Sequence, residues 1–154
     1  MNLFEIPSSV FMLLCNILGI IFALIFISVV ILDRQSRTMT VLLVLNSIIA
    51  GLLVNIIYAC QALYQLIDDG NDKLCAFRGF LLHETSGLLY HTFCIQAFYR
   101  LLTTISIQER YLRSKRVIMF VVLLQWLISL TFGLPILLTG RIKYQAGSRI
   151  CQVN

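Results

Sequence analysis

The chain has 154 residues, of which 59% are hydrophobic and only 12% are charged. Soluble proteins average about 45–50% apolar and about 25% charged residues, and a soluble domain of this size leaves much of its surface in water, so lipid is the expected solvent. The net charge is +5, but the basic residues lie singly or beside apolar runs, so the sequence does not favour nucleic-acid binding.

Four segments are long and apolar enough to cross a bilayer as helices, which takes about 20 residues. They lie at approximately 7–32, 39–67, 74–106 and 117–139. Short connectors join them and a polar tail follows, at 33–38, 68–73, 107–116 and 140–154. The charge-free run from Ile6 to Leu32 exceeds the roughly 7–15 residues of a signal-peptide core. We therefore predict an all-α integral membrane helical bundle with four transmembrane helices.

The second and third segments each contain a pair of residues at a distinctive spacing. The second begins RTMTVLLVLNSIIAGLL, in which seven residues separate Thr38 from Asn46. On the third, Cys75 precedes Arg100 by 25 residues. These two residues therefore stand at opposite ends of one predicted helix.

The fourth segment and the tail contain three further distinctive residues. Trp126 stands in the middle of the segment, Pro135 follows nine residues later, and Cys151 lies in the tail. Taken together, the four segments resemble the rhodopsin-like (class A) family of G-protein-coupled receptors. The resemblance implies four helices of a seven-helix receptor that senses an extracellular ligand and signals to a heterotrimeric G protein. Because three helices are missing, we expect the chain to be an N-terminal fragment.

The resemblance also implies a disulfide between Cys75 and Cys151, which two crossings place on the same side of the membrane. Lys and Arg counts on the two sides, six against five, leave the orientation nearly undecided. A disulfide persists on the oxidising side. That side would hold the N-terminus, the 68–73 loop and the 140–154 tail, and both basic connectors would be cytoplasmic. The expected location is the plasma membrane, as a multi-pass protein.

The chain departs from the family at the positions that help to bind sodium. The helix-one Asn, helix-two Asp and helix-three Ser positions fall on Ala23, Gly51 and Leu89. These residues offer no side-chain ligand, so we expect no sodium site in these helices, and we expect no other metal and no cofactor. The triplet Tyr99-Arg100-Leu101 stands where the family has Asp-Arg-Tyr, so the acid that would restrain the arginine is absent.

By resemblance, Arg100 contacts the G protein, and Ile107 is the apolar loop residue that docks into it. The alternative for Arg100 is contact with lipid headgroups. Asn46, Thr92 and Trp126 occupy positions that meet across helices two, three and four in the family. Because amide and indole groups need partners in lipid, we expect a structural hydrogen-bond cluster there rather than a ligand site.

The ligand pocket is expected at the outer ends of helices two and three. The residues assigned to it are Leu82, His83, Ser86, Gln61 and Tyr64. Amine receptors of the family carry Asp where this chain has Leu82, so a biogenic amine is disfavoured and the ligand stays unidentified.

Glu84 is an intramembrane carboxyl expected to point sideways, toward neighbouring helices. It is either a functional group or a residue satisfied locally by His83 or the backbone. No nucleophile–base arrangement, paired carboxylates or phosphate-binding loop is evident, so we do not expect an enzyme.

The alternative function is a four-helix membrane scaffold or a transporter subunit. Tetraspanin-like proteins carry a large cysteine-bearing loop between helices three and four, whereas residues 107–116 are short, basic and free of cysteine. A transporter would have helices broken at mid-membrane, for which Gly51 and Gly87 are the only indications.

Overall fold

The computed structural model describes residues 5–33, 38–67, 75–105, 114–138, 142–145 and 150–153. The described elements are four helices and two strands: α1 (Glu5–Leu32), α2 (Met39–Ile67), α3 (Cys75–Ile105), α4 (Lys115–Leu138), β1 (Ile142–Gln145) and β2 (Ile150–Val153). Each helix begins and ends within two residues of its predicted bounds. The helical fold class is confirmed.

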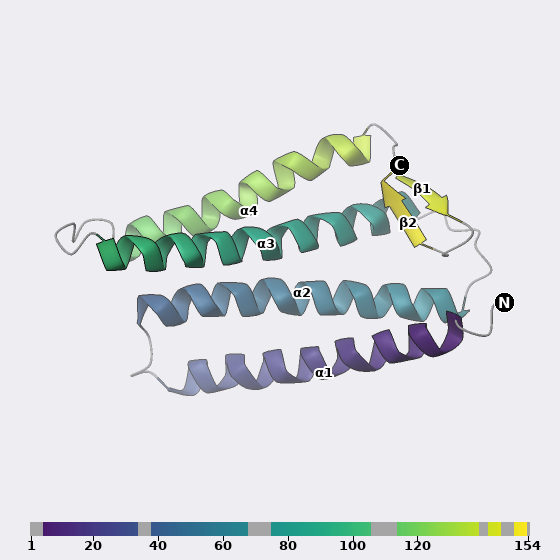
Figure 1. Cartoon of the computed structure of the whole chain (residues 1–154), viewed down its shortest axis with the longest axis horizontal. Helices are drawn as coiled ribbons and strands as arrows, with labels where there is room; N and C mark the ends of the chain where they lie inside the picture. Colours follow the sequence, from purple (N-terminus) through teal and green to yellow (C-terminus); the bar gives the residue numbers. More distant parts are fainter. Residues whose placement is uncertain are drawn as a thin grey trace.

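The helices lie side by side in chain order, with α2 and α3 in the centre and α1 and α4 at the edges (Figure 1). Neighbours run antiparallel, as short connectors require. The arrangement gives the molecule two ends. We call the end where α1 and α3 finish and α2 and α4 begin the connector end. The opposite end, where α3 begins beside the two strands, is the hairpin end (Figure 1).

Local sequence signals set the helix starts at the connector end. The backbone N–H of Val41 donates to Thr38 Oγ1 at 3.4 Å, so Thr38 caps the first turn of α2. Ser114 precedes α4, and its carbonyl accepts a bond from the backbone N–H of Ile118 at 3.2 Å. Both helix N-termini are thereby fixed at the same end of the bundle.

Three of the four helices are long and apolar enough to cross a membrane. Their apolar stretches are Ile6–Leu32, Met39–Leu66 and Lys115–Pro135. α3 is long enough but more polar, and it is not among them. Because α3 lies between α2 and α4, its polar side chains face protein as well as solvent. That α3 also crosses the membrane stays a prediction.

The tail departs from the all-α expectation, because part of it forms a two-stranded hairpin. β1 pairs antiparallel with β2, and Tyr144 lies opposite Cys151. Both strands contact α3. Each strand has only four residues, which is too short for the two-residue alternation of a strand to stand out in the sequence.

Candidate functional site

A chain of buried and half-buried polar side chains connects α2 to α4 in the middle of the bundle. Trp126 Nε1 donates to Asn46 Oδ1 at 3.0 Å, and Asn46 Nδ2 donates to Gln125 Oε1 at 3.4 Å. Gln125 Nε2 in turn donates to the carbonyl of Leu88 on α3 at 3.3 Å. The amide and indole groups are thus satisfied across three helices, as their low-dielectric surroundings demand.

Thr92, the third residue expected in this cluster, takes a different partner. It is almost fully buried, but its hydroxyl donates to the carbonyl of Leu89 in its own helix at 2.7 Å. The structure therefore brings Asn46 and Trp126 together. Thr92 is hydrogen-bonded within α3 instead. Gln125 was not predicted from the sequence to belong to this cluster, although a glutamine in an apolar segment needs a hydrogen-bond partner.

A second polar contact joins α2 and α3 nearer the connector end. Gln96 Nε2 donates to the carbonyl of Leu43 at 3.0 Å and also to Ser47 Oγ. Sequence reasoning missed Gln96 as well. Because Gln96 lies one turn before Arg100, this contact holds the arginine's part of α3 against α2.

Arg100 is exposed at the connector end of α3. It borders a small cavity together with Tyr99 and the α2 residues Thr40 and Val44. The hydroxyls of Thr103 and Thr104, in the next turn, donate to its carbonyl. The Arg100 side chain is thus exposed at the connector end of the helices.

The remaining residues expected at this surface are not described. Ile107 and the basic residues of the connector between α3 and α4 up to Arg113 lie outside the described residues. Their roles stay predictions.

At the hairpin end, polar side chains of α2 and α3 face each other. Tyr58 Oη and Ser86 Oγ are 3.4 Å apart and share a hydrogen bond. The guanidinium carbon of Arg78 lies 3.3 Å from the ring centroid of Tyr64, a cation–π contact. Sequence reasoning had not assigned Arg78 or Tyr58 to a pocket.

The other residues expected in the ligand pocket differ in exposure. Gln61 is buried on α2, and Leu82 is half-buried on α3. His83 is exposed. The structure thus gathers Ser86, Tyr64 and two unforeseen residues between the helices, whereas His83 lies on the surface of the described bundle.

Glu84 is buried where α3 meets α4. Ser129 Oγ donates to its Oε2 at 3.4 Å. Gly133 lies directly against the carboxyl, so that a Cβ atom at this position would overlap it. Glu84 therefore points sideways to a neighbouring helix, and its hydrogen-bond partner there is a side chain of α4.

The three positions that the resemblance matches to sodium ligands are apolar, and none of them is exposed. Ala23 is buried, and a Cβ atom at Gly51 would lie 4.0 Å from Leu89 Cδ1. Gly51 and Leu89 therefore lie on faces of α2 and α3 that contact each other. Within the described residues, no group of three or more His, Cys, Asp or Glu could hold a metal ion.

The cysteines divide into two groups. Cys15, Cys60 and Cys94 are free and exposed on the helices. Cys75 is the first residue of α3 and Cys151 lies in β2, and these two elements are in contact. The side chains of Cys75 and Cys151 lie outside the described residues, so their disulfide stays a prediction.

Comparison of the chain with protein-family models gives no match, and comparison with curated proteins gives none either.

Proposed function

We propose that this chain contributes four helices to a rhodopsin-like receptor, which senses an extracellular ligand and signals to a heterotrimeric G protein. The observation that carries the proposal is the 3.0 Å hydrogen bond between Trp126 Nε1 and Asn46 Oδ1. The resemblance picked out these two residues from their spacing in the sequence alone. They lie on different helices, 80 residues apart. A chance resemblance in sequence would not require them to meet.

The two ends of the molecule carry different polar residues, and this difference supports the same function. Arg100 is exposed at the connector end. The Tyr58–Ser86 and Arg78–Tyr64 contacts lie toward the hairpin end, on the same helices. A receptor needs a ligand site and a partner site on opposite sides of the membrane, linked by helices that can shift between two arrangements.

We further propose that the connector end faces the cytoplasm and the hairpin end faces outward, at the plasma membrane. The contact of β2 with α3 supports a disulfide between Cys75 and Cys151 on the oxidising side. Arg34, Arg37, Arg110, Arg113, Lys115 and Arg116 would then be cytoplasmic, in keeping with the positive-inside rule.

The test is guanine-nucleotide exchange on purified heterotrimers, one from each α-subunit class, driven by membranes that contain the full-length product of the gene. We expect exchange above that of empty membranes without added ligand. Arg100→Ala should lower this rate about tenfold or more, because a hydrogen bond to a charged group contributes about 1.5–3 kcal/mol and about 1.4 kcal/mol is tenfold in rate.

Thr104→Ala is the matched control for Arg100→Ala. It lies at the same end of α3 and removes only a bond within the helix, so its exchange rate should equal that of the unchanged protein. Exchange no faster than in empty membranes on every heterotrimer, with the protein folded, would contradict the receptor proposal. The scaffold or transporter function would then be preferred.

A further inference from the structure

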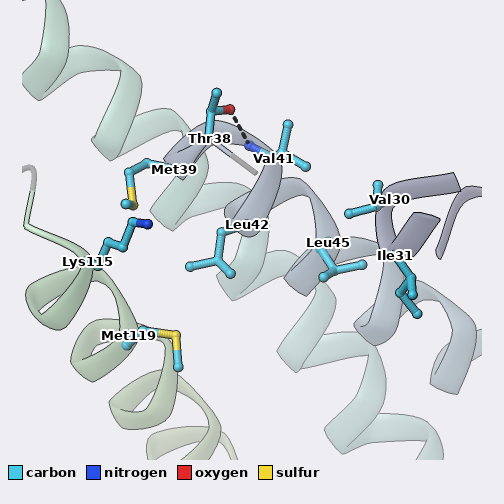
Figure 2. A pocket seen from close by; sticks show the side chains of 9 residues that line it. All are labelled: Val30, Ile31, Thr38, Met39, Val41, Leu42, Leu45, Lys115 and Met119. Atoms are coloured by element: carbon cyan, nitrogen blue, oxygen red, sulfur yellow. Dashed lines mark hydrogen bonds between the residues drawn. The ribbon is translucent and has the colours of Figure 1, made fainter. Parts of the chain in front are cut away.

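A groove of about 350 Å³ opens between α1, α2 and α4 at the connector end (Figure 2). Its walls are apolar over most of their extent, with Ile31 from α1, Leu42 and Leu45 from α2, and Met119 from α4. Its volume falls within the range of about 300–1,000 Å³ that is typical of ligand pockets. An apolar molecule, or the apolar part of one, is what these walls would hold.

Two polar side chains, Lys115 and Thr38, complete the lining. The Lys115 side chain reaches from α4 toward Met39 and Leu42 of α2, so that its ammonium group lies over the apolar wall (Figure 2). The Thr38 oxygen accepts the capping bond from Val41, and its side chain points away from Lys115 (Figure 2). The groove therefore presents a cation at one end and hydrocarbon elsewhere.

The backbone adds to this positive end. α2 begins at Met39 and α4 begins at Lys115, so both helix N-termini lie beside the groove. The first N–H groups of a helix lack partners within it, and the helix dipole is positive there. A negatively charged group is therefore favoured beside Lys115 and the two helix N-termini.

We propose that this groove binds one anionic phospholipid, with its phosphate beside Lys115 and the N-termini of α2 and α4 and an acyl chain against Leu42, Leu45 and Met119. A zwitterionic lipid such as phosphatidylcholine carries a quaternary ammonium that offsets its phosphate, so its headgroup attracts the Lys115 ammonium less, and a small soluble anion would leave the apolar walls uncovered. The proposal requires that α1, α2 and α4 lie in a bilayer, and it does not depend on receptor activity. In the proposed orientation, the groove faces the cytoplasmic leaflet, which carries anionic lipids.

Native mass spectrometry of the purified chain in detergent tests the ionic half of the proposal. The chain is mixed with equimolar phosphatidylglycerol and phosphatidylcholine that carry identical acyl chains. We expect the one-lipid complex to favour phosphatidylglycerol about fivefold, the effect of one basic side chain near an anionic lipid surface. Lys115→Gln should abolish this preference, and Lys115→Arg should keep it.

Arg116→Gln is the matched control, because it removes the adjacent positive charge at a residue that does not line the groove. It should keep the preference for phosphatidylglycerol. Equal binding of both lipids by the unchanged chain would overturn the proposal, and so would an undiminished preference in Lys115→Gln. Circular dichroism of each variant verifies that its helices are intact.

The apolar half is tested by filling the groove. Leu45→Trp should weaken phosphatidylglycerol binding about fourfold for each methylene group that it displaces. Leu123→Trp, at an exposed α4 position that does not line the groove, should have no effect. Unchanged binding in Leu45→Trp, or displacement of the lipid by millimolar inorganic phosphate, would show an anion site without a lipid chain and would overturn the proposal.

Discussion

α1 and α3 are helices of similar length that are held in different ways. Along α1, between residues 6 and 32, Ala23 is the one buried residue. α3 buries Glu84, Thr85 and Thr92, and the cluster around Asn46 bonds to its backbone. The edge helix thus relies mainly on apolar surface, with a hydrogen bond from Ser9 Oγ to Gln65 Oε1 of α2 at 3.2 Å, whereas the inner helix makes specific polar contacts with both of its neighbours.

The difference shows what sequence hydropathy measures in a membrane protein. Hydropathy reports contact with lipid, so it marks α1 clearly, and α3 is not among the helices that it marks. Between two other helices, a polar side chain can find a partner, and its burial then costs little. If this contrast is right, small changes beside α3 should cost stability, and small changes beside α1 should cost almost none.

The largest effect is expected where α4 meets α3. A Cβ atom at Gly133 would overlap the Glu84 carboxyl, so Gly133→Ala has to push the helices apart or displace a buried carboxyl group. We expect a loss of about 1–3 kcal/mol in the free energy of unfolding, as for other overpacked sites. Titration with sodium dodecyl sulfate in mixed micelles measures it.

Two further variants separate overlap from charge at this contact. Glu84→Ala in the Gly133→Ala background should recover most of the loss, whereas Glu84→Gln, which keeps the shape, should not. Gly87→Ala is the matched control, because nothing lies within 4 Å of a Cβ atom at that position. A Gly133→Ala chain as stable as Gly87→Ala would mean that α3 and α4 do not pack as described.

The next effect concerns the hydrogen bond between Trp126 and Asn46. A double-mutant cycle with Asn46→Ala and Trp126→Phe should give a coupling energy of about 0.6 kcal/mol and at most about 1.7 kcal/mol, the range for hydrogen bonds between membrane helices. The same cycle with Ser129→Ala in place of Trp126→Phe should give no coupling, because Ser129 bonds to Glu84 instead. Additivity of the first pair would count against the contact.

The smallest effect is expected between α1 and α2. A Cβ atom at Gly19 would lie 2.6 Å from Asn55 Nδ2, but this atom is the end of a side chain that can move. Alanine also favours a helix by about 1 kcal/mol over glycine. Gly19→Ala should therefore change the unfolding free energy by less than about 0.5 kcal/mol. A loss as large as that of Gly133→Ala would erase the contrast between the edge helix and the inner helix.

The sequence predicts the helices well and their contacts only in part. Apolar runs end at charged connectors, which is why the helix bounds agree to within two residues. A polar residue in an apolar run indicates that a hydrogen-bond partner is needed, but the sequence does not show which residue that partner is. The Asn46–Trp126 contact was anticipated by resemblance, whereas the roles of Gln96 and Gln125 depend on how two helices are rotated against each other.

Three further contacts could not be predicted from the sequence, because each depends on how elements pack against one another. The cation–π contact of Arg78 with Tyr64 depends on the two helices being adjacent at the hairpin end. The Glu84–Ser129 bond depends on Gly133 allowing close approach. The hairpin of β1 and β2 is held by contact with α3, which no local pattern reports.

The most direct test of the proposed receptor assignment is whether Cys75 and Cys151 form a disulfide in protein purified from cell membranes. Free thiols are alkylated first, and the protein is then digested and analysed by mass spectrometry without reduction. We expect one cross-linked peptide pair that joins Cys75 to Cys151, with Cys15, Cys60 and Cys94 alkylated as free thiols. Alkylation of both Cys75 and Cys151 before any reduction would contradict the orientation and, with it, the receptor assignment.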